Sequence, residues 1–64
     1  MKKYIVTIDI HRYIDDYKAV AEPKIIEVEA GNKRIASLRA MMELNKDKEY
    51  AGLYKTLKSV EEVK

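Results

Sequence analysis

The sequence predicts an α+β fold in which a small antiparallel β-hairpin or sheet is followed by two helices, in the order β-β-α-α. Three observations predict it. Residues 3–12 alternate between apolar and polar side chains, and residues 24–30 do the same. Directly after Gly31-Asn32, the apolar spacing changes from two to about 3.6, the period of a helix. We expect a single domain over residues 1–64, with dimerisation as one way to complete the small sheet.

The first strand is predicted over residues 3–12. One of its faces carries only apolar residues, namely Tyr4, Val6, Ile8 and Ile10. The other face mixes Ile5 with polar side chains. Alternation with many β-branched residues is typical of a half-buried strand, so we expect the even-numbered face to pack on the core.

Residues 13–23 allow two interpretations. In the first, Asp15-Asp16 forms the turn of a long hairpin, because aspartate tolerates turn conformations and bonds to its own backbone. In the second, the segment forms one helical turn, because Ile14, Tyr17 and Ala21 share a helical face. Pro23 lacks a ladder donor, which favours an edge or a bulge. We favour the hairpin.

The second strand is predicted over about residues 24–30. Its core face carries Ile26, Val28 and Ala30, and its other face carries Ile25, Glu27 and Glu29. The sheet face opposite the core would then hold Ile5 and Ile25 among polar residues, which is either incidental or part of an interface.

The first helix, residues 32–45, is apolar along two lines. We expect the line of Ile35, Leu38 and Met42 to face the core. The second line consists of Ala36, Ala40 and Leu44. A helix that is apolar on two sides needs two neighbours, and alanines allow one of them to approach closely. We therefore predict that Ala36, Ala40 and Leu44 meet the C-terminal helix or a second molecule, and we take them as candidate partner-binding residues.

The second helix is predicted over residues 47–60. Asp47 is a suitable N-cap. The apolar residues that follow have helical spacing, namely Tyr50, Leu53, Tyr54, Leu57 and Val60.

Size and composition restrict the function. A chain of 64 residues buries only about 60% of the surface that it exposes when unfolded, so its core is marginal. There are no cysteines and one histidine, which rules out disulfides and a zinc site of the usual kind. Because small domains need such additional support, we expect a homo-oligomer or a protein partner.

Charge and hydropathy exclude further classes of protein. Thirteen basic and eleven acidic residues give a net charge of +2, which is too balanced to indicate nucleic acid by itself. No run approaches the ~20 apolar residues that cross a bilayer. We expect a cytoplasmic protein without membrane contact.

Candidate chemistry is sparse. Asp9-x-His11 puts a carboxylate and an imidazole on one strand face, but two ligands do not complete a metal site, so a solvated face is favoured. Asp15-Asp16 with Glu22 lacks the further oxygen ligands of a calcium loop. We expect no catalytic residues, no metal and no cofactor.

The segment Tyr13-Ile14-Asp15-Asp16-Tyr17 is a candidate contact loop. Tyrosines beside acids at a hairpin tip resemble the composition of interface hot spots. The alternative interpretation is that both tyrosines cover the edge of a small core.

The junction Val28-Glu29-Ala30-Gly31-Asn32, followed by Ile35-Ala36, resembles a pattern of small uncharacterised proteins of bacteriophages and prophages. The resemblance covers residues 1–44, including the opening Met1-Lys2-Lys3-Tyr4-Ile5. Where that pattern carries acids in the first helical turn, this chain has Lys33-Arg34. The resemblance implies a small accessory protein that binds a host protein, and it supplies no site residues.

These observations predict a non-enzymatic protein-interaction module, of the kind that binds or inhibits a host protein. The alternative function is a dimeric DNA-binding protein of the ribbon–helix–helix type, because a strand over residues 24–30 followed by two helices has that order. Glu27 and Glu29 would face the DNA in that arrangement and would repel phosphate. Nucleic acid is therefore not the favoured partner.

Overall fold

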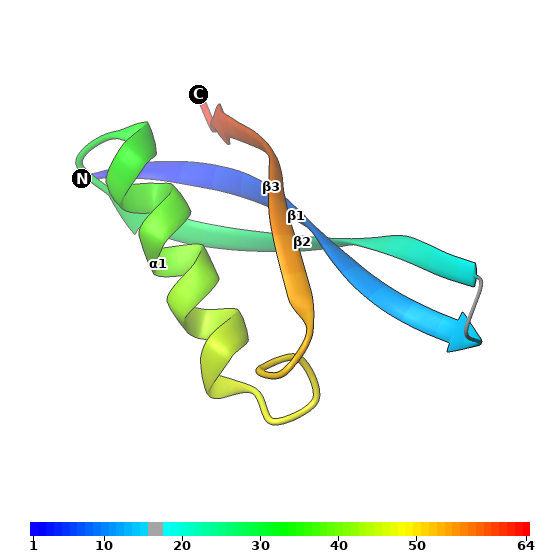
Figure 1. Cartoon of the computed structure of the whole chain (residues 1–64). Helices are drawn as coiled ribbons and strands as arrows, with labels where there is room; N and C mark the ends of the chain where they lie inside the picture. Colours follow the sequence, from blue (N-terminus) through cyan, green and yellow to red (C-terminus); the bar gives the residue numbers. More distant parts are fainter. Residues whose placement is uncertain (16–17) are drawn as a thin grey trace.

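The structure, a computed structural model, describes residues 1–15 and 18–64. Three strands and one helix follow one another as β1 (Lys2–Asp15), β2 (Lys18–Ala30), α1 (Lys33–Lys46) and β3 (Tyr54–Glu62) (Figure 1). The strands form one antiparallel sheet in the order β2-β1-β3. The fold is thus α+β and rich in β-structure. The predicted β-β-α-α order is wrong, because a strand occupies the second half of the segment expected to form the second helix.

The β1–β2 hairpin is present and longer than expected. Its register runs from Lys2 opposite Ala30 to Tyr13 opposite Ala19. Residues 18–23 belong to β2, so the helical-turn interpretation of this segment is wrong. Asp16 and Tyr17, which include half of the predicted Asp15-Asp16 turn, lie outside the described residues.

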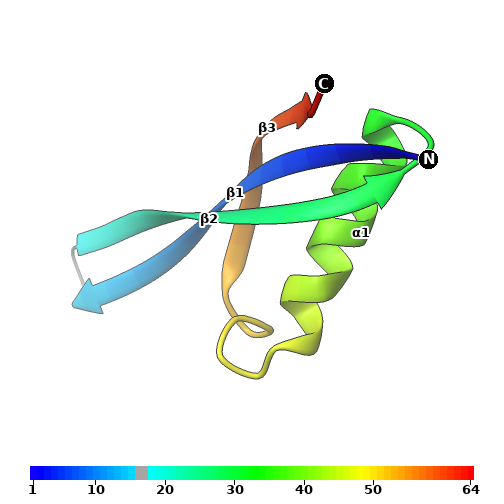
Figure 2. The same cartoon turned by 180° about the vertical axis from the view of Figure 1, so that it is seen from behind.

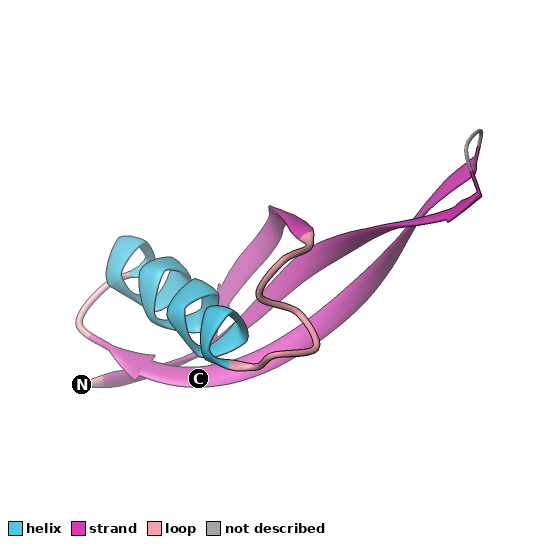
Figure 3. Ribbon diagram, turned by 60° about the horizontal axis from the view of Figure 1, so that its bottom comes forward, coloured by secondary structure: helices cyan, strands magenta, loops and turns pink. Residues whose placement is uncertain are grey.

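Helix α1 begins at the predicted cap. The side-chain oxygen of Asn32 accepts a 2.9 Å hydrogen bond from the backbone N–H of Ile35, which satisfies one of the free amides at the helix N-terminus. The helix lies across one face of the sheet (Figure 3). Its buried residues are Ala36, Ala40 and Leu44, and they pack with the large side chains of β1, namely Tyr4, Val6, Ile8 and Ile10.

The prediction for the two lines of α1 is therefore inverted. Ala36, Ala40 and Leu44 face the sheet, whereas Ile35, Leu38 and Met42 are exposed. The physical reason is volume, because the sheet supplies bulky side chains and a close-packed core then needs small ones from the helix. The line is consequently part of the core, and Ala36 and Ala40 are not available to a partner.

The predicted second helix is absent, and Asp47, its predicted N-cap, is the C-cap of α1. The side chain of Asp47 accepts a hydrogen bond from the N–H of Glu49, and its carbonyl accepts hydrogen bonds from Tyr50 and Ala51. A single turn follows, and after Gly52 the chain extends into β3.

An irregularity in β3 explains why this segment has helical spacing. Leu57 lies opposite Ile8 and Val60 lies opposite Val6, with a register shift between Thr7 and Ile8. Both residues therefore lie on the same side of the sheet although they are three positions apart, because one extra residue interrupts the alternation. A bulged strand and an amphipathic helix share this spacing.

Strand β3 completes the sheet from within the chain. It occupies the side of β1 that β2 leaves free, so the expected completion by dimerisation is not what the sheet uses. Within the described residues, α1 covers one sheet face and no element covers the other, which we call the open face. No helix in the described part of the chain is long and apolar enough to cross a membrane.

The β1–β2 hairpin extends past the region where β1 pairs with β3, and we call this extension the arm. The β1–β3 pairing ends at His11 opposite Tyr54, whereas the β1–β2 pairing continues past Tyr13. The arm extends away from α1 and gives the chain an elongated shape of 43 × 20 × 14 Å (Figures 1 and 2). At its base Arg12 lies 3.5 Å from the carboxylate of Glu22 and 3.6 Å from that of Glu49.

Candidate protein-binding surface

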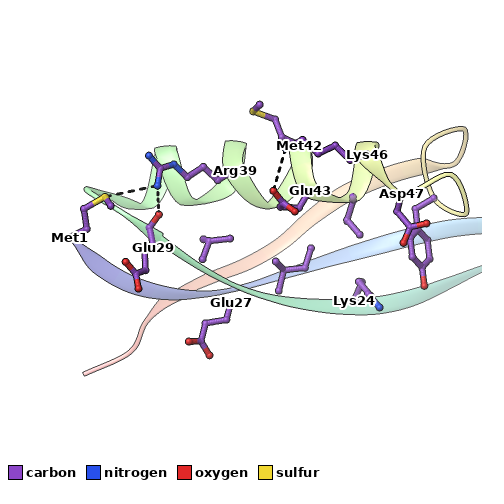
Figure 4. Close-up of a pocket in the computed structure, with 13 residues that line it drawn as sticks. Met1, Lys24, Glu27, Glu29, Arg39, Met42, Glu43, Lys46 and Asp47 are labelled. Carbon is purple, nitrogen blue, oxygen red and sulfur yellow. Dashed lines mark hydrogen bonds and ion pairs between the residues drawn. The ribbon is translucent and has the colours of Figure 1, made fainter.

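A groove of about 690 Å³ runs between α1 and β2 (Figure 4). Its apolar lining comes from Ile26 and Val28 of β2, Leu44 of α1 and Tyr50 of the following turn. Side chains of α1 form the opposite wall, namely Arg39, Met42, Glu43 and Lys46. The groove is therefore apolar inside and charged at its rim, which is the usual composition of a binding cleft.

The outer edge of β2 borders this groove, and β2 has a neighbouring strand on one side only among the described residues. The backbone N–H of Val63 donates to the carbonyl of Lys3, so the main-chain groups of Lys3 point toward β3. Because these groups alternate along a strand, those of Tyr4 and Val6 point toward β2. Their partners Val28 and Ile26 point back toward β1. The main-chain groups of Ile25, Glu27 and Glu29 therefore point outward from the sheet.

Two features limit this edge. Pro23 belongs to the same outward-facing set and carries no N–H, so it interrupts the edge without costing a bond to β1. At the other end, the guanidinium of Arg39 donates a 2.6 Å hydrogen bond to the carbonyl of Glu29. Between Pro23 and Glu29, Ile25 and Glu27 are the outward residues whose N–H and C=O both lack a hydrogen bond in the described structure.

The outer side of α1 carries exposed apolar residues beside the groove. Ile35, Leu38 and Met42 are 37%, 53% and 59% exposed, and we call them the α1 stripe. Met42 belongs to the stripe and is also among the residues that line the groove, so the stripe adjoins the groove at this residue. Contiguous exposed apolar surface of this kind marks interaction sites more often than scattered apolar residues do.

The structure separates the sequence-predicted site residues into two groups. Ala36 and Ala40 are buried in the core and form no surface, whereas Leu44 is buried in the core and also lines the groove. Tyr13 and Ile14 are 81% and 63% exposed near the tip of the arm, and Asp15 is exposed beside them. Tyr13 therefore does not cover the core edge, which contradicts the alternative interpretation of this residue. Asp16 and Tyr17 lie outside the described residues.

Asp9 and His11 lie on the open face. The Nε2 atom of His11 lies 2.9 Å from the hydroxyl oxygen of Thr56, and its ring centroid is 5.2 Å from that of Tyr54. These contacts hold the imidazole against β3. No group of three or more potential metal-ligating side chains occurs among the described residues.

The charges around the β2 edge are mostly acidic on the open face. Glu27 points away from the groove, and its carboxylate lies 3.6 Å from the ammonium of Lys3 (Figure 4). Glu29 is two residues further along β2 and lies on the same face. The ribbon–helix–helix alternative needs two helices after the strand, whereas α1 is the only helix in the described residues, and Glu27 and Glu29 are among the outward residues of β2.

Sequence reasoning missed the α1 stripe and the groove because it assigned the stripe to the core. One available signal was the alanine spacing, since small residues at i and i+4 indicate where a helix approaches its neighbour closely. Comparisons of the chain with protein-family models, with curated proteins and with solved structures found no match.

Proposed function

We propose that this chain is a small, non-enzymatic protein-interaction module that binds another protein along the α1 stripe and the adjoining groove. One observation carries the proposal. The stripe of Ile35, Leu38 and Met42 is exposed, although a chain of this size gains stability from every apolar side chain that it buries. Covering the stripe together with the groove would remove two adjoining apolar surfaces from water.

The edge of β2 supports this proposal independently. Unpaired main-chain groups at Ile25 and Glu27 lie next to an apolar groove, and this combination suits strand addition, in which the main chain supplies affinity and alternate side chains supply specificity. The resemblance of residues 1–44 to phage and prophage accessory proteins favours a protein of the bacterial host as the partner, with inhibition of that protein as the effect. Self-association through the same surface is the expected competing reaction.

Differential capture from a lysate of the native host tests the proposal. The native chain is immobilised beside a double variant, Leu38→Glu with Met42→Glu, which places two carboxylates on the α1 stripe. The matched control is Tyr54→Glu with Val63→Glu, because Tyr54 and Val63 are also exposed and lie outside the groove lining. Circular dichroism checks that all three chains are folded.

The proposal predicts proteins that the native chain and the control retain in equal amounts and that the stripe variant loses. Equal retention by all three chains would show that the stripe does not carry the interaction. Retention of nothing by the native chain, measured as a monomer at micromolar concentration, would also overturn the proposal.

A further inference from the structure

We infer that the groove between α1 and β2 takes an extended peptide segment that runs antiparallel to β2. The segment carries, from its N-terminus to its C-terminus, a cationic, an apolar, a cationic and two apolar residues. This inference rests on the proposed function and specifies the chemistry of the partner at the same site.

The main chain fixes the position of the segment. A residue placed opposite Glu27 forms a hydrogen-bonded pair with it, and the residue two positions later forms the same pair with Ile25. At Glu29, only the backbone N–H can pair with the segment, because the carbonyl of Glu29 already accepts a hydrogen bond from Arg39. Toward the arm, Pro23 offers no donor. The edge therefore pairs fully over a short segment and cannot add a long strand.

The groove determines two of the side chains. Residues of an added strand that lie opposite Ile26 and Val28 share the helix-facing side of the sheet with them, because directly opposed residues point to the same face. Their side chains enter the space bordered by Ile26, Val28 and Met42. Aliphatic residues at these two positions would bury apolar surface on both partners, and a charged residue there would lose its hydration.

The open face determines the other three side chains of the segment. The residues opposite Glu29 and Glu27 lie beside carboxylates, and opposite charges on neighbouring strands stabilise a pair. The residue opposite Ile25, which is 66% exposed, lies beside an aliphatic side chain. Strand β1 shows the same chemistry on the other side of β2, where Lys3 is opposite Glu29 and Tyr4 is opposite Val28.

Charge favours such a segment over a second copy of the chain at this edge. The outward residues Ile25, Glu27 and Glu29 include two acids and no cation. A two-fold pairing of β2 with itself centred on Glu27 would place this carboxylate opposite its own copy, and like charges opposite one another are destabilising. A cationic partner segment has the complementary pattern.

Titration of the ¹⁵N-labelled full chain with synthetic peptides tests the inference. The probe is acetyl-Gly-Lys-Val-Lys-Val-Val-Gly-amide. A charge-reversed peptide carries glutamate in place of both lysines, and a third peptide is N-methylated at the second lysine, whose N–H would pair with Glu27. The protein variant Glu27→Lys completes the set, because Glu27 is exposed and its replacement leaves the core unchanged.

We expect saturable binding of the probe with a dissociation constant below about 1 mM, with shifts confined to residues 24–29 and 39–46. The amides of Ile25 and Glu27 should gain protection against hydrogen exchange. The charge-reversed peptide should bind about tenfold more weakly, since two cross-strand pairs are lost. In the Glu27→Lys variant, the difference in affinity between the probe and the charge-reversed peptide should become smaller or change sign. N-methylation of the probe should abolish binding.

Three results would overturn the inference: no shifts at millimolar peptide, binding that survives N-methylation, or protection of Ile25 and Glu27 in a dimer of the chain without peptide. These results are distinguishable from a failure of the proposed function. If the peptide does not bind but the α1 stripe variant still loses captured proteins, the interaction surface stands and its partner is not an extended segment of this kind.

Discussion

The guanidinium of Arg39 donates a 2.6 Å hydrogen bond to the carbonyl oxygen of Glu29, and thereby joins the outer side of α1 to the free edge of β2. The same nitrogen lies 3.9 Å from the sulfur of Met1. Edge strands are commonly protected by charged side chains and by proline. Arg39 and Pro23 border in this way the stretch of the β2 edge that lies beside the groove, and Ile25 and Glu27 lie between them.

Replacing Arg39 by alanine should lower the free energy of unfolding by about 0.5–1.5 kcal/mol, because the hydrogen bond to Glu29 is lost. Urea denaturation followed by circular dichroism measures the change. The control is Arg34→Ala, since Arg34 is also an exposed arginine of α1 and forms no hydrogen bond or ion pair in the described structure. Equal effects of the two substitutions would indicate that helix propensity, and not the bond to Glu29, accounts for the loss.

Replacing Leu44 by alanine should lower the free energy of unfolding by about 2–5 kcal/mol, because Leu44 is buried between α1 and the sheet and its truncation leaves a cavity. A domain of this size has a total stability of only about 3–10 kcal/mol, so much of it would be lost. The matched substitution Leu38→Ala, on the exposed α1 stripe, should cost less than about 0.5 kcal/mol. A larger effect at Leu38 than at Leu44 would mean that the helix is rotated relative to the structure described here.

Local patterns predicted the parts of the fold that depend on local interactions. The alternation of residues 3–12 identified β1, and Gly31-Asn32 identified the start of α1, because strand period and N-cap chemistry act within a few residues. The apolar pattern of α1 did not by itself predict which side of the helix faces the sheet. Both of its lines are apolar, and the choice depends on the size of the side chains that the sheet presents.

Strand β3 could not be predicted from the pattern of its own residues. Its apolar residues have helical spacing because of the irregularity opposite Thr7 and Ile8, and the side chain of Asp47 bonds to the N–H of Glu49 as an N-cap would. Pairing with β1 overrides both signals. The groove could not be inferred for the same reason, since it exists only where α1 has been placed beside the edge of β2.

Replacing Arg12 by glutamine should lower stability by about 0.5–1.5 kcal/mol, and 1 M NaCl should reduce this difference. Arg12 is partly buried, lies near two carboxylates, and has its guanidinium carbon 5.7 Å from the centroid of the Tyr50 ring. The control is Lys46→Gln, which breaks an exposed pair with Glu43 and should change stability by less than about 0.5 kcal/mol. Thermal unfolding at low and high salt measures both. If the loss of stability in the Arg12→Gln variant does not depend on salt, packing alone accounts for the contribution of Arg12.

A pair of proline substitutions tests the pairing of β3 with β1 at the C-terminal end of the strand, beyond the helix predicted over residues 47–60. Glu61 lies opposite Ile5 and has the same alternation as Val63, whose N–H donates to the carbonyl of Lys3, so the N–H of Glu61 points toward β1. The N–H of Glu62 points away from the sheet. Glu61→Pro should therefore cost about 1–3 kcal/mol more than Glu62→Pro, because only the first removes a ladder donor. Similar losses of stability for the two variants in urea denaturation would contradict this pairing.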